Sequence, residues 1–185
     1  MEDLSLHILD IVENAISAKA KRIDILVIEE PKEDRLVIEI KDDGIGMDEE
    51  VSRKATDPFF TTRTSRKVGL GLSLMAQSAQ EAGGGLRIES EAGKGTKVTA
   101  TFQYHHVDRK PLGSMLETVT TLLLGNSELN FSYIHQKEGN SYVLESRVLK
   151  ERFKGRPFTD PVVIQWLRKH LKEGLAGIGV HPVRK

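Results

Sequence analysis

Residues 23–46 read IDILVIEEPKEDRLVIEIKDDGIG and contain two apolar runs around a charged turn. Isoleucine and valine recur at every second position over 23–27, and leucine and isoleucine do so over 36–40. This alternation is the period of strands with one buried face. Pro31 and its charged neighbours interrupt the alternation, so the two runs predict a β-hairpin. Residues 42–46 predict a glycine-bearing loop behind the second strand.

The flanking sequence supplies helices and a second pair of strands. Apolar residues at helical spacing predict a helix over about 4–20, and glycines bound a second predicted helix over 70–82. Asp48 can cap a short helix, and residues 86–90 and 96–102 predict two more strands. The order of helix, two strands, helix and two strands predicts a two-layer α/β sandwich, with helices covering one face of a sheet.

The composition shifts near residue 104, which indicates a division of the chain. We expect one domain over 1–104, a linker over 105–113 and a small α+β extension over 114–185. No motif in this extension indicates its role, and dimerisation and partner docking both remain open. Its expected elements are a helix over 114–124, a hairpin of 131–134 with 142–145, and a helix from Pro161 to about 173.

The composition excludes several classes of protein. The 27 Lys and Arg residues equal the 27 Asp and Glu residues, so no basic excess draws the chain to nucleic acid or to an anionic membrane. The chain has no cysteine, which excludes disulfides, thiolate metal sites and a cysteine nucleophile. No apolar run approaches the roughly 20 residues of a membrane span. We therefore expect a soluble, cytoplasmic protein with no nucleic-acid or membrane partner.

The first predicted helix carries a polar face. Steps of three and four residues place His7, Asp10, Asn14, Ser17 and Lys21 on one side of it. A solvated face is the ordinary interpretation of such a stripe. An acid and an amide four residues apart also suit a site in which the amide oxygen contacts a metal ion and the carboxylate orients a water molecule. We interpret His7 as a hydrogen-bonding or packing residue rather than a base.

Residues 42–47, 69–73 and 93–96 each contain two glycines, which allow tight turns and a close approach of the backbone to a ligand. The second of these segments opens a helix whose free N–H groups suit a phosphate. It is not a P-loop, because no Gly-Lys-Ser/Thr follows at the required spacing, and not a dinucleotide fingerprint, because the third glycine is missing. Taken singly, each segment is typical of an ordinary turn or helix start.

The order and spacing of these motifs resemble the GHKL superfamily of ATP-binding domains, which includes gyrase, the large heat-shock chaperone, histidine kinases and MutL. The resemblance covers about the first 104 residues and implies a histidine kinase-like ATPase fold that binds ATP with Mg²⁺. Five motifs carry it: the asparagine box Asp10-Ile11-Val12-Glu13-Asn14-Ala15, the first glycine box Asp42-Asp43-Gly44-Ile45-Gly46, the phenylalanine box Asp57-Pro58-Phe59-Phe60-Thr61-Thr62-Arg63, the second glycine box Gly69-Leu70-Gly71-Leu72-Ser73, and Gly93-Lys94-Gly95-Thr96.

The resemblance implies a role for each matching residue. Asn14 would ligate the Mg²⁺ that bridges the phosphates. Asp42 would accept a hydrogen bond from the adenine amino group, with Thr96 supporting it through water. Gly46 would leave room for the base, and Gly69, Gly71 and the helix that they open would cradle the phosphates. The complete implied ATP-binding set is Asn14 (also the magnesium ligand), Asp42, Ile45, Gly46, Met47, Thr61, Thr62, Arg63, Gly69, Leu70, Gly71, Leu72 and Thr96, in which Thr61, Thr62 and Arg63 begin the lid and Ile45, Met47 and Leu72 line an apolar slot.

Asp10 is the candidate catalytic base that the resemblance implies. ATP-hydrolysing members of the superfamily place a glutamate four residues before the asparagine, and here that position holds the shorter aspartate. A base must come within about 3 Å of the water that it activates, so hydrolysis remains open. Glu13 is another acid nearby, but its place on the helix points it away from the Asn14 face.

Two branches of the superfamily are represented. Residues 57–96 are most similar to histidine kinases, whereas the first helix is more similar to MutL. The helical hairpin that carries the phosphoacceptor histidine of kinases has no counterpart in the sequence. His106 has the spacing of the kinase histidine box but follows the ATP-binding region, so we interpret it as an exposed linker histidine.

Three functions follow from the resemblance. We favour an ATP-dependent kinase that transfers the γ-phosphate in trans to a histidine or serine of a protein partner, in signalling or regulation. The alternatives are an ATP-hydrolysing conformational switch of the MutL type and a non-catalytic ATP sensor that binds a partner. A homodimer is compatible with each of the three.

Overall fold

The computed structural model describes residues 3–56 and 71–181. Within these residues, no helix combines the length and the apolar character needed to cross a membrane. In chain order the elements are α1 (Leu4–Ser17), β1 (Arg22–Glu30), the short 3₁₀ helix η1 (Pro31–Glu33), β2 (Arg35–Asp42), α2 (Glu49–Lys54), α3 (Gly71–Glu81), β3 (Gly85–Glu91), β4 (Gly95–Gln103), α4 (Met115–Gly125), β5 (Asn130–Lys137), β6 (Asn140–Glu145), α5 (Ser146–Arg152) and α6 (Pro161–Gly177).

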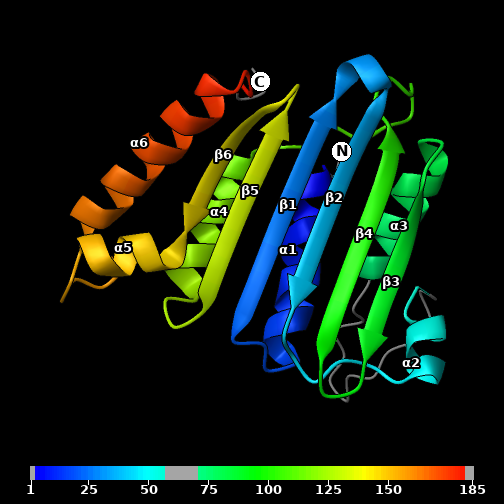
Figure 1. The fold of residues 1–185 in the computed structure, drawn as a ribbon, viewed down its shortest axis with the longest axis horizontal. Helices are drawn as coiled ribbons and strands as arrows, with labels where there is room; N and C mark the ends of the chain where they lie inside the picture. Colours follow the sequence, from blue (N-terminus) through cyan, green and yellow to red (C-terminus); the bar gives the residue numbers. More distant parts are fainter. Residues whose placement is uncertain (1–2, 57–70, 182–185) are drawn as a thin grey trace.

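The strands of the described residues form one six-stranded sheet in the order β3-β4-β2-β1-β5-β6. Neighbouring strands are antiparallel except for β1 and β5, which are parallel. Helices α1, α3 and α4 lie together behind the sheet in Figure 1, and α6 runs beside β6. This arrangement confirms the predicted two-layer α/β sandwich.

The predicted hairpin of β1 and β2 forms the centre of the sheet. Ile25 pairs with Ile40 and Val27 pairs with Ile38, so the apolar positions of both strands face the same side. These four side chains are at most 2% exposed and belong to one core with the apolar face of α1. The strand period in the sequence is therefore set by burial against that helix.

The C-terminal half of the chain joins the same sheet. Parallel neighbours need a crossover connection, and α4 lies in the connection that places β5 beside β1. Val119 and Leu123 of α4 and Tyr133 of β5 are buried in the core that α1 also enters. The predicted extension over 114–185 therefore adds strands to the sheet of residues 1–104 instead of forming a sheet of its own. The division into domains stays a prediction.

The ends of α1 and α6 lie three and four residues from those predicted, and one helix was not predicted. α1 ends at Ser17, three residues before the predicted end at 20. Lys19, which follows the helix, has a positive φ of 61°, and a right-handed helix cannot continue through such a residue. α6 continues to Gly177, four residues past the predicted end at 173, because Leu175 still packs in the core. The sequence did not predict α5, whose seven residues are too few to establish a helical period.

Candidate functional site

The predicted site residues of the described chain gather at one end of the sheet. In Figure 1 this is the lower end, where β2 and β3 finish and β4 begins. The C-terminal part of α1 reaches the same end, and α3 starts there. Short helix α2 lies beside the end of β3. Segments that are far apart in the sequence therefore contribute to one site.

Asp42 is the last residue of β2 and is paired in register with Thr96 of β4. Its Oδ1 accepts a 2.8 Å hydrogen bond from the backbone nitrogen of Gly44, so the loop turns back onto the carboxylate. Burial raises the pKa of Asp42 above its ordinary value of 3.8, while the backbone N–H groups of Gly44 and Thr96 act in the opposite direction. A half-buried carboxylate at a strand end can accept a hydrogen bond from an amino group of a ligand.

The loop that follows β2 is hydrogen-bonded to the residues that follow α1. The Asp43 carboxylate accepts hydrogen bonds from the backbone nitrogens of Lys21 at 2.7 Å and Arg22 at 2.8 Å. The backbone N–H of Ile45 donates to the carbonyl oxygen of Ala18 at 2.9 Å. Partial burial alone would raise the pKa of Asp43, but the hydrogen bonds from Arg22 and Lys21 outweigh it and lower that pKa. This acid therefore has a structural role, and the role of Asp42 toward a ligand stays a prediction.

Gly46 and Gly95 let two segments of backbone approach each other closely. Gly46 has a φ of 65°, and a side-chain carbon there would collide with the carbonyl oxygen of Glu91. Gly95 has a φ of 96°, and a side-chain carbon there would collide with the carbonyl oxygen of Asp42. The structure thus gives Gly46 a packing role against the turn between β3 and β4. Its implied role of leaving room for a base stays a prediction.

Ser90 joins β3 and β4 to the loop behind β2. Its Oγ accepts a hydrogen bond from the backbone nitrogen of Met47 at 2.8 Å and donates one to the carbonyl oxygen of Gly95 at 3.0 Å. The same Oγ lies 2.8 Å from Oγ1 of Thr96. Sequence reasoning missed this serine. The signal was present, because one predicted strand ends at Ser90 and the next begins at Thr96, which places the two residues opposite each other in a hairpin.

Asp10 and Asn14 lie about one helical turn apart on α1, the first exposed and the second partly buried. Gly71, the first residue of α3, packs directly on this helix, since a side-chain carbon at Gly71 would lie 2.5 Å from Cβ of Asp10. The N-terminus of a helix presents backbone N–H groups and the positive end of the helix dipole. The contact therefore brings the predicted phosphate-binding helix start beside the predicted base and metal ligand.

The remaining predicted ligand residues have varied positions. Met47 and Leu72 are partly buried, and Leu72 packs against the core. Ile45 is 62% exposed, so it does not line a closed slot, and its contact with a base stays a prediction. Five predicted residues lie outside the described part of the chain: Thr61, Thr62, Arg63, Gly69 and Leu70.

The described residues fit a magnesium ion only when it arrives with other oxygen ligands. In residues 3–56 and 71–181, no three His, Cys, Asp or Glu side chains gather into a group that could hold a metal ion. Magnesium in nucleotide sites keeps water and phosphate oxygens and needs only one or two protein ligands. The amide oxygen of Asn14 can supply one of them. The donor set therefore fits magnesium bound together with a phosphate chain.

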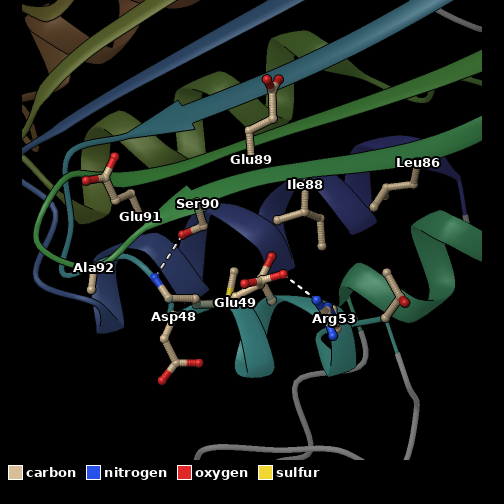
Figure 2. Close-up of a pocket in the computed structure, with 12 residues that line it drawn as sticks. Asp48, Glu49, Arg53, Leu86, Ile88, Glu89, Ser90, Glu91 and Ala92 are labelled. Carbon is tan, nitrogen blue, oxygen red and sulfur yellow. Dashed lines mark hydrogen bonds and ion pairs between the residues drawn. The ribbon is translucent and has the colours of Figure 1, made fainter.

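A cavity of about 780 Å³ lies beside this site, between α2 and β3 (Figure 2). Leu86, Ile88 and Met47 supply its apolar surface. Its charged lining residues are Asp48, Glu49, Glu89, Glu91 and Arg53. Met47 is also the one predicted ATP-binding residue among the described residues that line the cavity. The cavity therefore shares Met47 with the predicted nucleotide site.

The comparisons with known proteins agree with this arrangement. The sequence model of the family described as "Histidine kinase-, DNA gyrase B-, and HSP90-like ATPase" matches residues 2–106. Sporulation kinase E of Bacillus subtilis is 38% identical over 89 residues, which are 48% of this chain and 12% of that protein. Sensor histidine kinase WalK of the same organism is 32% identical over 111 residues, which are 56% of this chain and 18% of that protein. The chain thus spans less than a fifth of the length of these relatives.

A solved structure described as "Crystal Structure of N terminal domain of a DNA repair protein" has the same fold. It superposes with a TM-score of 0.57 at 17% identity, and the match covers 85% of this chain and 59% of that one. The family match extends over more than half of the 185 residues and includes all the elements that meet at the end of the sheet described above. The chain therefore belongs to the family of histidine kinase-, DNA gyrase B- and HSP90-like ATPases.

Proposed function

We propose that this end of the sheet binds ATP with Mg²⁺ and that the chain transfers the γ-phosphate to a histidine or serine of a protein partner. The bond between the γ-phosphorus and the bridging oxygen breaks, and a bond from phosphorus to the acceptor nitrogen or oxygen forms. ADP leaves, and the proton of the acceptor passes to solvent or to a base. Magnesium would supply charge neutralisation for the phosphate oxygens.

The contact between Gly71 and Asp10 is the observation that carries this proposal. It sets the start of an eleven-residue helix against the helix that holds Asn14. A helix start suits the phosphate chain, and an amide oxygen suits the magnesium ion. Asp42, at the end of the neighbouring strand, offers a half-buried acceptor to the amino group of the adenine.

Transfer to a partner is supported by the names of the relatives, two of which are a sporulation kinase and a sensor histidine kinase. His106 of the same chain is a poor acceptor on grounds of position. A side-chain carbon at Gly83 would lie 3.5 Å from Cδ2 of His106, and Gly83 follows the end of α3. The site lies at the other end of that helix. An acceptor on another protein therefore fits the fold better than His106 does.

A second candidate function, slow ATP hydrolysis that drives a conformational switch, is favoured by the place of Asp10. Its side chain lies beside the start of α3 and about one helical turn before Asn14. A carboxylate in that position can orient a water toward a γ-phosphate held between the two helices. In this reaction the phosphate passes to water instead of to a partner.

Calorimetry with ATP in the presence and absence of Mg²⁺ tests the binding part of the proposal. The Asn14→Ala variant should bind ATP with an affinity that no longer depends on Mg²⁺. Glu13→Ala is the matched control, because Glu13 is exposed on another side of α1. If the folded wild-type protein takes up no ATP or ADP with Mg²⁺ present, the proposed nucleotide site is wrong.

Radiolabelled γ-phosphate separates the reactions. The kinase proposal expects label on a protein of a cell extract that is added to the chain, and loss of that label with Asn14→Ala. Release of free phosphate that Asp10→Asn abolishes would favour the switch. Tight ATP binding with neither labelled protein nor free phosphate would contradict both and leave a sensor that binds a partner.

A further inference from the structure

Among the described strands, β3 forms one edge of the sheet. It stands at the end of the strand order and pairs with β4 on one side. None of the other described strands pairs with its second side. An edge strand presents backbone N–H and C=O groups that can pair with another chain. At the opposite edge of the sheet, α6 runs beside β6 (Figure 1), and Gly174 of α6 packs against the ring of Tyr142. Each of the two edge strands thus has a helix beside it, α2 at β3 and α6 at β6.

The side chains of β3 alternate between the two faces of the sheet. Leu86, Ile88 and Ser90 share the face that carries α2, and Figure 2 shows Ile88 and Leu86 directed toward the cavity beside that helix. Leu86 and Ile88 are only partly buried within this chain. On the other face, Arg87 and Glu89 are 75% and 47% exposed and form an ion pair of 3.1 Å.

The sequence of β3 is complementary to itself when it is read in the opposite direction. Residues 85–91 read GLRIESE, with Ile88 at the centre. In an antiparallel pair of two such strands centred on this residue, Ile88 faces the partner's Ile88. Arg87 then faces the partner's Glu89, and Glu89 faces the partner's Arg87. Opposite charges placed directly across a strand pair stabilise it, and like charges destabilise it.

The charges also select this register over its neighbours. The two nearest registers that keep the helices of both copies on the same side of the sheet differ by a shift of two residues. One of them places Arg87 opposite the partner's Arg87, and the other places Glu89 opposite the partner's Glu89. A shift of one residue would turn the apolar side chains to the charged face. The centred register is the one that avoids each of these faults.

We propose that two copies of this chain associate through antiparallel pairing of their β3 strands, centred on Ile88, to give one continuous sheet. The second copy would place its own Leu86 and Ile88 side chains over the cavity of about 780 Å³ between α2 and β3. Such an interface is isologous, since the same surface of each copy meets its twin around a two-fold axis. It leaves the nucleotide site of each copy built from its own residues.

Charge reversal with measurement of the mass in solution tests the pairing. The wild-type chain should have twice its monomer mass of 20.6 kDa. Arg87→Glu sets a glutamate against the partner's Glu89, and Glu89→Arg sets an arginine against the partner's Arg87. Each reversal should weaken the dimer by at least about tenfold. The double variant restores opposite charges and should restore the dimer.

Reversal of the Arg35–Glu30 ion pair is the matched control, because it joins the exposed Arg35 of β2 to the half-buried Glu30 of β1, away from the edge. Arg35→Glu with Glu30→Arg should leave the mass unchanged. A wild-type chain that stays monomeric throughout a concentration series would overturn the proposal. A dimer that persists in both single reversals would do so too, as would a β3 edge that binds only a different protein.

A disulfide test reports the register directly, because the chain has no cysteine of its own. Directly opposite residues of an antiparallel pair have Cα atoms about 4.5–5.5 Å apart, which a disulfide can bridge. Ile88→Cys should therefore form a cross-linked dimer on mild oxidation. Leu86→Cys should not, because its symmetry mate is offset by four residues, or about 13 Å. Equal cross-linking of the two variants would contradict the centred register.

Discussion

Gly71 lies against Asp10, so that a side-chain carbon on the glycine would come within 2.5 Å of Cβ of the aspartate. This contact joins the start of α3 to the middle of α1 and links two of the motifs that the sequence suggested. It lies at the end of the sheet where Asp42 closes β2. The fold thus brings together residues whose motifs, taken singly, are typical of an ordinary turn or helix.

Replacing Gly71 with alanine should separate the two helices. The added methyl group has no room beside Asp10, and overpacking of this kind costs about 1–3 kcal/mol in the free energy of unfolding. ATP affinity should fall as well, because α3 must move away from Asn14. Urea denaturation and calorimetry measure the two effects. Gly125→Ala in α4 is the control, since nothing lies within 4 Å of its side-chain position and the change should be neutral or slightly stabilising.

Replacing Asp42 with asparagine should stabilise the protein and weaken nucleotide binding. Asparagine keeps an oxygen for the N–H of Gly44 but loses the charge, so ATP affinity should fall by the roughly 1.5–3 kcal/mol of a charge-assisted hydrogen bond. An unchanged affinity in calorimetry would contradict the adenine assignment. The gain in stability follows because burial raises the pKa of Asp42, which means that the folded protein disfavours its ionised form.

The pH dependence of unfolding checks the same residue with the sign worked out. The pKa of Asp42 is higher in the folded protein than in the unfolded chain, so the folded state holds more protons between the two values. Its contribution to stability is present below the unfolded value of 3.8 and is lost as the pH rises through the folded value. Asp42→Asn should remove this loss. The idea fails if the difference between the variant and the wild type is the same at every pH.

Replacing Ser90 with alanine should loosen the turn between β3 and β4. The hydroxyl group accepts the N–H of Met47 and donates to the carbonyl oxygen of Gly95, and the variant leaves both groups without this partner. The expected loss is about 1–3 kcal/mol in the free energy of unfolding. ATP affinity should fall with it, because Thr96 sits in the same hydrogen-bond cluster. Ser141→Ala on the exposed part of β6 should change neither quantity.

The local structure was predictable where a single segment determines it. The alternation of β1 and β2 follows from burial of one face, and the register of Ile25 with Ile40 follows from the turn between them. Helix caps were predictable for the same reason, because Asp48 and Asp160 bond to backbone nitrogens within three residues of themselves. These features depend on neighbours in sequence, so the chain itself carries the signal.

The pairing of β1 with β5 was not predictable in this way. Ile25 pairs with Tyr133, which lies more than 100 residues further along the chain. A pairing over this separation produces no local periodicity in the sequence from which it could be predicted. The reason for Gly46 was missed too. A glycine is needed at this position because the backbone at Glu91 comes close to it, and this contact exists only once the sheet has formed. Of the candidate site, the sequence thus supplied the residue types, and the fold supplied their contacts.

Glu29 lies at the centre of a buried polar network that ties the two halves of the sheet together. Its Oε1 is 2.9 Å from Nε2 of His135, and its Oε2 accepts a 3.0 Å hydrogen bond from the hydroxyl of Tyr104. Nδ1 of the same histidine is 2.7 Å from the hydroxyl of Tyr133, and Nζ of Lys137 lies 3.8 Å from Oε2 of Glu29. The histidine ring is fully buried. The network therefore joins β1 to β5 and to the end of β4.

Replacing Glu29 with glutamine should destabilise the protein. It should also make the free energy of unfolding fall less steeply as the pH is lowered. Burial alone would raise the pKa of Glu29, but the hydrogen bonds of His135 and Tyr104 and the charge of Lys137 hold it below its ordinary value of 4.5. The stabilisation is present above the unfolded value of 4.5 and is lost as the pH falls through the folded value. Glu29→Gln should lower the free energy of unfolding by about 1–3 kcal/mol at neutral pH. Glu30→Gln is the control. If the free energy of unfolding of Glu29→Gln falls with decreasing pH as steeply as that of the wild type, this role of Glu29 is contradicted.

Removal of residues 114–185 should leave a chain that folds poorly, although it keeps all the motifs of the family. β1 would lose its eight register pairs with β5 and become an apolar open edge. The core would lose Val119, Leu123 and Tyr133, and each buried apolar side chain contributes about 1.5–3 kcal/mol. Urea denaturation of residues 1–113 should therefore show a free energy of unfolding several kcal/mol below that of the full chain. Equal stability of the two would mean that the predicted domain folds alone and that the added strands serve another purpose.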